Sequence, residues 1–185
     1  MLRILILGLK ITRLKKMIKL TVFQKKIIRL IEFFAILSLA SIPLYLINAL
    51  NINLYPIQYF EASCASLMLN LFSVPHVLTE AISYDTGYEM PVITAGTESL
   101  GIDRACTGLA PMLAFLGLVI ASPKNNKKKA LVYLPAIFSL NIIRLFILGI
   151  VSWQAPSMIE IIHSLLWSFG LVLAVFLLWA KWFKS

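Results

Sequence analysis

One cysteine stands where a polar segment of the chain meets an apolar one. Cys106 follows Asp103 and Arg104 and precedes an apolar run that continues to residue 122. This position predicts that Cys106 lies where a helix begins, at a membrane surface. Because the dipole and the free N–H groups of a helix N-terminus favour the thiolate, we expect the pKa of this thiol to be lowered.

Two further residues have side chains that complement a nucleophilic thiol. Arg144 lies within a later apolar run, and His163 lies near the start of the last one. An imidazole can accept the thiol proton and later donate it to a leaving amine, and a fixed cation can stabilise an oxyanion. The set predicts covalent acyl transfer with Cys106 as nucleophile. Asn141 shares a helical face with Arg144 and is expected to orient Arg144 or a substrate carbonyl.

Each of these residues also has a non-catalytic interpretation. A lone cysteine in an apolar protein is usually a small buried hydrophobe. An arginine within a span is functional by default, although it can also extend toward the lipid headgroups. A small membrane structural or transport subunit is therefore the rival class. The sequence indicates no cofactor and no metal site, because His76 and His163 are the only histidines and lack ligand-like spacing.

The composition is that of an integral membrane protein. The chain has 185 residues, of which 60% are hydrophobic and 14% charged, enough for one domain. The net charge of +9 comes from basic residues that flank apolar runs, which indicates membrane topology and contact with anionic lipid rather than nucleic acid. Two cysteines are too few for a disulfide framework, although a single Cys64–Cys106 pair remains an alternative.

The apolar runs predict an all-α integral membrane protein with about four transmembrane helices, plus interfacial helices. The expected spans are residues 31–50, 106–122, 130–151 and 159–180. Residues 56–74 are interrupted by polar side chains, so we expect them to lie in the outer interface or to re-enter.

Two further segments complete the expected organisation. Within the polar stretch 76–105, β-rich pieces at 92–94 and 100–102 flank a glycine-containing turn, which predicts a small extracytoplasmic hairpin that leads to Cys106. Residues 1–30 form a basic amphipathic segment, either an interfacial helix or a solvated cytoplasmic tail. Residues 31–185 are then a single transmembrane catalytic domain.

The distribution of basic residues predicts the topology. The N-terminal segment, the 124–129 loop and the C-terminus hold nine, four and two of the 17 Lys and Arg residues, so these regions are expected in the cytoplasm. This arrangement requires four spans; an additional span within the first 30 residues is the rival. It places Cys106 and His163 near the outer surface, with Arg144 roughly 10 Å of helix from it.

The segments Ala105-Cys106-Thr107-Gly108-Leu109 and Asn141-Ile142-Ile143-Arg144, followed by His163, resemble the archaeosortase/exosortase family. The resemblance covers roughly residues 55–170, with the motifs in the family's order. It implies a multi-pass membrane cysteine peptidase or transpeptidase, sortase-like by convergence, in the cell membrane. The implied catalytic set is Cys106, Arg144 and His163, and the supporting or substrate-binding residues are Asn141, Thr107, Gly108 and Arg104.

The resemblance also implies the partners. Proteins of this family process precursor proteins that end in a short motif, a transmembrane helix and a basic tail. Cleavage is expected to accompany transfer to a membrane lipid or another surface acceptor, on the extracytoplasmic side of the membrane.

Overall fold

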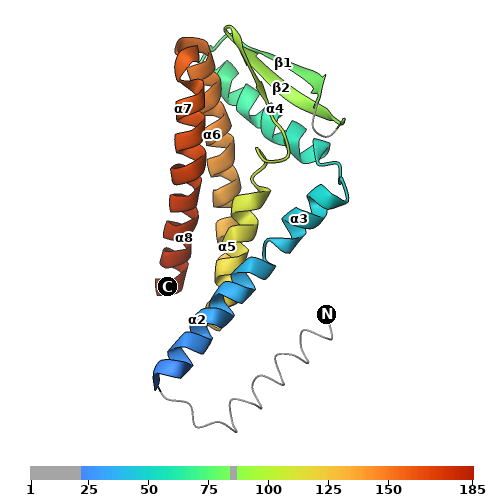
Figure 1. Cartoon of the computed structure of the whole chain (residues 1–185). Coiled ribbons are helices and arrows are strands. Elements are labelled where there is room, and N and C mark those ends of the chain that lie inside the picture. The colour runs from blue at the N-terminus through green and yellow to red at the C-terminus, as the bar shows by residue number, and fades with distance from the viewer. Residues whose placement is uncertain (1–21, 84–86) are drawn as a thin grey trace.

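The computed structural model describes residues 22–83 and 87–185, and it shows long helices with a small sheet at one end (Figure 1). The first 21 residues of the predicted basic segment lie outside the described residues. The remainder of that segment belongs to helix α2 (Val22–Leu39), which runs past the expected boundary at residue 30 without a break. Helix α3 (Ile42–Ala49) follows, with Pro43 in its first turn, where a missing N–H is tolerated.

Helices of the second half of the chain pack beside one another along the length of the molecule (Figure 1). They are α5 (Leu109–Ala121), α6 (Leu134–Gln154), α7 (Ile159–Leu165) and α8 (Val172–Lys184). A 3-10 helix at Lys127–Tyr133 leads into α6, and a π-helical turn at Leu166–Leu171 joins α7 to α8.

Three helical stretches in the described part of the chain are long and apolar enough to cross a membrane. They are Phe23–Ala49, Lys127–Gln154 and Pro156–Lys184, and α5 is a shorter apolar helix. These four elements correspond to the four predicted spans, so the predicted helical membrane architecture is confirmed.

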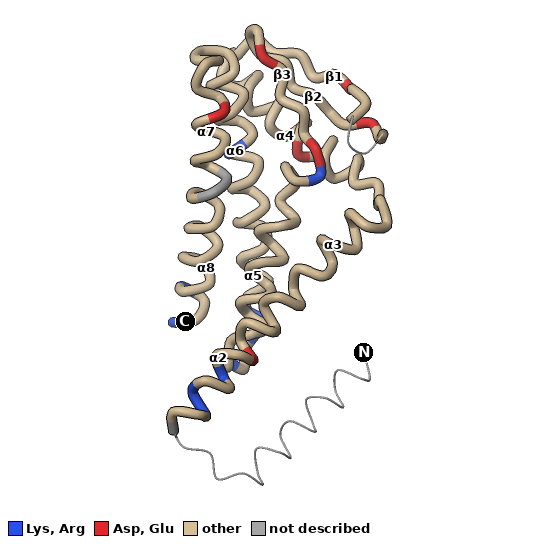
Figure 2. The backbone as a smooth tube through the Cα atoms, viewed as in Figure 1, with Lys and Arg blue, Asp and Glu red and all other residues tan. Residues whose placement is uncertain are grey.

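The charged residues separate toward the two ends of this bundle. Figure 2 shows Lys and Arg around the start of α2 and the end of α8, whereas most Asp and Glu residues lie near the sheet, α4 and α7. At the basic end, the Nζ atom of Lys124 donates to the carbonyls of Trp182 and Phe183 at 2.8 and 3.0 Å. The loop that begins at Lys124 therefore caps the last turn of α8.

The sheet at the acidic end has three antiparallel strands in the order β1-β2-β3. The strands are β1 (Val77–Ile82), β2 (Glu89–Ala95) and β3 (Glu98–Gly101). The pair β2–β3 is the hairpin that the sequence predicted. Strand β1 was not predicted, because almost all of its residues are exposed and its sequence has no apolar alternation.

The turn of the hairpin is fixed against α6. Gly96 has a φ of +67°, and a Cβ atom there would lie 3.2 Å from the Ser152 carbonyl oxygen, so both the backbone conformation and the limited space favour glycine. The Ser152 hydroxyl contacts the carbonyls of Ala95 and Glu98 at 3.1 and 3.3 Å. This docking sets the path along which β3 leads to Cys106.

Helix α4 (Tyr55–Leu71) lies at the sheet end and runs obliquely to α6, α7 and α8 (Figure 1). It is not among the stretches of the described chain that are apolar enough to span. One face of α4 packs against α6 and β2. Its buried residues are Gln58, Glu61, Ala62, Ala65 and Leu69. Two of these five are polar, which is unusual for a packed helix face and directs attention to what they bind.

Candidate active site

Cys106 lies in a short loop between β3 and α5. Its N–H donates to the Oδ1 atom of Asp103 at 2.9 Å, and the Thr107 hydroxyl donates to the Arg104 carbonyl at 2.8 Å. These bonds form a tight turn in which Cys106 precedes Leu109, the first residue of α5. The cysteine is therefore close to the helix N-terminus, as expected, but not in the helix itself.

The expectation of a lowered thiol pKa was wrong. Cys106 is only 8% exposed, and its burial raises the pKa of the thiol to about 11. The nearby Asp103 carboxylate also raises this pKa, while the positive charge of Arg144 opposes both effects. Desolvation of the thiolate thus outweighs the helix dipole. The Cys106 side chain is a protonated thiol at neutral pH, and its use as a nucleophile requires a base.

Two buried side chains of α4 hold the two ends of this loop. The Glu61 carboxylate accepts the Gly108 N–H at 2.9 Å, and Gln58 donates its Nε2–H to the Ile102 carbonyl at 2.8 Å. Neither residue was predicted from the sequence. The available signal was that Glu61 is the single charged residue of α4, and a carboxylate is costly to bury unless it has partners.

A chain of hydrogen bonds joins Cys106 to His163 through α6. Asn141 donates its Nδ2–H to the Cys106 carbonyl at 2.9 Å, and its Oδ1 atom accepts from Arg144 at 3.3 Å. The Nη2 atom of Arg144 lies 2.8 Å from Nε2 of His163. The structure therefore brings together the four residues that the sequence singled out from three separate segments.

The Arg144–His163 contact defines the protonation of the imidazole. Arginine has only donors, so Nε2 of His163 must be the acceptor and the ring must be neutral with its proton on Nδ1. The other histidine is held locally: the two ring nitrogens of His76 contact the Val74 carbonyl at 2.9 Å and the Ser66 hydroxyl at 2.7 Å. Both ring nitrogens of His76 are thus used in local contacts, whereas Nε2 of His163 is a hydrogen-bond acceptor directed at the buried Arg144.

Arg144 is 3% exposed, so its guanidinium does not extend to the membrane surface as the alternative interpretation required. Among the described residues, Arg144 and Glu61 are the only charged side chains that are buried. Asn141 bridges them, because its Nδ2 atom also donates to the Glu61 Oε2 atom at 3.2 Å. A buried cation and a buried anion therefore meet through one amide.

The remaining predicted site residues have different surroundings. Thr107 and Gly108 are buried in the turn, and a Cβ atom at Gly108 would lie 3.3 Å from Oε1 of Glu61. Arg104 instead lies over the ring of Tyr88, 5.3 Å from its centroid. Both cysteines are free, so the alternative Cys64–Cys106 disulfide is not formed.

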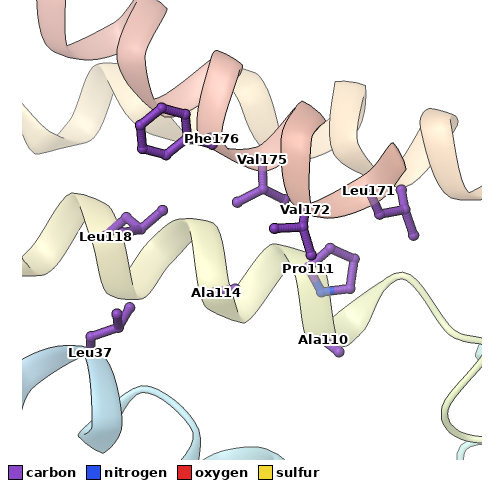
Figure 3. Close-up of a pocket in the computed structure, with 9 residues that line it drawn as sticks. All are labelled: Leu37, Ala110, Pro111, Ala114, Leu118, Leu171, Val172, Val175 and Phe176. Atoms are coloured by element: carbon purple, nitrogen blue, oxygen red, sulfur yellow. The ribbon is translucent and has the colours of Figure 1, made fainter. Parts of the chain in front are cut away.

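An apolar groove of about 570 Å³ begins close to this loop (Figure 3). Figure 3 shows α5 and α8 on its two sides, with a side chain from α2 at its edge. The lining residues are Leu37, Ala110, Pro111, Ala114, Leu118, Leu171, Val172, Val175 and Phe176. Ala110 and Pro111 follow Cys106 closely in the chain, so the groove opens beside the thiol-bearing turn.

The fold and the site define a multi-pass helical membrane protein with a buried cysteine whose backbone carbonyl is linked through Asn141 to an arginine and a neutral histidine. A sequence model of the transmembrane exosortase family matches residues 13–182, nearly the whole chain. The chain therefore belongs to the transmembrane exosortase family. This membership supports a membrane transpeptidase-type function at family level. Comparisons with curated proteins and with solved structures gave no match.

Proposed function

We propose that this protein is a membrane-embedded cysteine peptidase and transpeptidase. It cleaves C-terminal sorting signals of surface proteins and transfers the products to a lipid or surface acceptor. The observation that carries this proposal is the hydrogen-bonded chain from the Cys106 backbone through Asn141 and Arg144 to His163. Family membership, which implies processing of precursor proteins with C-terminal signals, supports the same reaction class.

The first step is attack of Cys106 on the scissile carbonyl. Because the thiol is protonated at neutral pH, its proton passes to Nε2 of the neutral His163 as the sulfur–carbon bond forms. For this transfer, Arg144 must release Nε2. The developing oxyanion is the stronger acceptor, so the guanidinium moves its hydrogen bond from the imidazole to the substrate oxygen.

The second step breaks the peptide C–N bond. The His163 imidazolium donates its proton to the leaving amine, and the precursor remains as a thioester on Cys106. The amino or hydroxyl group of the acceptor then attacks this thioester. His163 takes the acceptor's proton and passes it to the departing Cys106 thiolate, so that the enzyme returns to its starting state with a neutral imidazole and a protonated thiol.

The groove between α5 and α8 has the right character for the apolar membrane segment of a precursor. Its lining residues are all apolar, and two of them, Ala110 and Pro111, closely follow the turn that carries Cys106. We therefore place the precursor's membrane segment in this groove, with the cleavage site at the extracytoplasmic end. The acidic sheet end of the bundle faces the same side in this arrangement.

Substitution of each cysteine tests the proposal. Cys106→Ala should abolish processing of a precursor bearing a C-terminal signal, while the protein still accumulates in the membrane. Cys64→Ala is the matched control, since Cys64 lies on α4 with no part in the polar chain, and it should leave processing intact. Processing by Cys106→Ala at the parental rate would support a non-enzymatic membrane subunit instead.

A further inference from the structure

The buried carboxylate of Glu61 has contacts that the reaction steps above do not use. Glu61 is fully buried, with 0% of its surface exposed, and lies on α4 rather than on a helix that carries a catalytic residue. Burying a carboxylate is unfavourable unless it is paired and hydrogen-bonded. Both of its oxygens accept hydrogen bonds, from Gly108 and from Asn141.

These two acceptors determine which way the Asn141 amide points. The two hydrogens on Nδ2 are directed to Oε2 of Glu61 and to the Cys106 carbonyl, so Oδ1 is left facing Arg144. A flipped amide would place its oxygen against two acceptors and its N–H groups against the Arg144 guanidinium. The Glu61 carboxylate and the Cys106 carbonyl therefore together impose a single orientation on Asn141.

We propose that Glu61 is a positioning residue of the active site, which fixes the Cys106 turn and the Arg144 guanidinium at the same time through Gly108 and Asn141. This inference rests on the proposed function. Glu61 does not contact the reacting atoms in this scheme. It holds the turn that carries the nucleophile and, through Asn141, directs the donor that meets the oxyanion.

The electrostatic surroundings agree with this arrangement. Burial raises the pKa of Glu61 to about 7, while its bonds to Gly108 and Asn141 and the charge of Arg144 lower it and so favour ionisation. The ionised form is the one that accepts both hydrogen bonds without an unpaired O–H. A substantial part of the protein therefore has the organised site at neutral pH.

The isosteric change Glu61→Gln tests the proposal, because glutamine keeps the volume and offers one acceptor oxygen instead of two. We expect kcat to fall on the order of 100-fold, as for a small misplacement of catalytic groups, with KM changed less than about twofold. Ser63→Ala is the control, because Ser63 lies two residues from Glu61 on α4 and its hydroxyl donates to the Tyr59 carbonyl of the same helix, and this change should keep kcat within about twofold. Unchanged kcat in Glu61→Gln would overturn the proposal.

A second measurement does not depend on turnover. Cys64 lies on α4 close to Glu61 and reports on the integrity of that helix, so the two thiols can be alkylated and quantified in one sample. We expect Glu61→Gln to increase alkylation of Cys106 several-fold without a change at Cys64. An unchanged rate at Cys106 would show that Glu61 does not hold the cysteine turn, and an equal increase at both thiols would show a general structural role. Either result would overturn the proposal. Processing by Cys106→Ala would instead overturn the proposed function and leave this measurement valid.

The variant Glu61→Asp separates position from charge and serves if Glu61→Gln does not accumulate. Aspartate keeps the negative charge but withdraws the carboxylate by one methylene, so that it cannot reach both Gly108 and Asn141. We expect a loss of kcat comparable to that of Glu61→Gln. Parental kcat in Glu61→Asp would show that a negative charge alone suffices, and would overturn the positioning role.

Discussion

At the scale of single residues, burial decides how Cys106 can react. A thiol with a pKa near 11 is almost entirely protonated at neutral pH. It therefore reacts slowly with oxidants and alkylating reagents until a base removes its proton. In the proposed mechanism, the neutral imidazole of His163, whose Nε2 atom is held by Arg144, provides that base only when a substrate oxygen draws the guanidinium away. The proposed mechanism would thus couple activation of the nucleophile to the arrival of substrate.

This protection gives a pH prediction for alkylation of Cys106 in a Cys64→Ala background. Below the thiol pKa, the thiolate fraction rises about tenfold for each pH unit. Because the pKa is raised to about 11, the rate with a small neutral reagent should continue to rise from pH 7 to pH 9.5 without levelling. Alkylation kinetics in detergent measure this directly. A plateau near pH 8 would show that the thiol is activated in the resting protein.

Substitutions of Arg144 can distinguish a requirement for its planar guanidinium from a requirement for its positive charge. Two different nitrogens of its planar fork contact Asn141 and His163, and lysine retains the charge without the fork. Arg144→Lys should therefore accumulate normally and lose processing on the order of 100- to 1000-fold. Arg144→Leu should also lose processing, and it should accumulate less well because Glu61 loses its buried partner charge.

Processing assays alongside quantification of the membrane-inserted protein distinguish these effects. Parental activity in Arg144→Lys would show that charge alone is required, and parental activity in Arg144→Leu would remove Arg144 from the mechanism.

At the scale of elements, α4 and α5 contribute to different parts of the site. Helix α4 fixes both ends of the cysteine loop through Gln58 and Glu61, whereas α5 begins directly after that loop and forms one wall of the apolar groove. In the proposed complex, the precursor segment that leaves the groove at its sheet end would therefore reach Cys106 directly. The groove can be altered without touching any residue of the polar chain.

Filling the groove is the corresponding prediction. Ala114→Trp places a large apolar side chain between α5 and α8, and we expect it to reduce precursor processing at least tenfold while Cys106 alkylation stays unchanged. Leu173→Trp is the matched control, because Leu173 is an exposed residue of α8 outside the groove lining, and it should process normally. Equal processing by the two variants would place the substrate's membrane segment elsewhere.

At the scale of the whole molecule, the separation of charge along the bundle predicts its orientation. The basic end holds the 124–129 loop and the C-terminus, and the acidic end holds the sheet and the site. In intact cells, a membrane-impermeant thiol reagent should label Thr97→Cys at the hairpin turn but not Asn126→Cys. Label should reach Asn126→Cys only after permeabilisation. The reverse pattern would place the site in the cytoplasm and exclude the proposed processing of surface proteins.

Some features of this protein followed from the sequence alone. Apolar runs and the bias of Lys and Arg are read along the chain, so the helical membrane class and the four apolar segments could be predicted. Two β-rich pieces around a glycine-containing turn likewise predicted the β2–β3 hairpin. The position of each residue within its predicted span was also evident from the sequence. Together with the topology, it predicted that Cys106, Arg144 and His163 lie toward the same end of the bundle.

Tertiary structure alone decided the state of the site. Desolvation of Cys106 depends on packing against α4, β2 and α6, so the direction of its pKa shift could not be read from its place near a helix start. The bond from Glu61 to Asn141 joins residues that are 80 positions apart, and no local pattern encodes such a partner. Hydropathy and charge act on each residue where it stands, whereas burial and hydrogen-bond pairing depend on which distant segments meet.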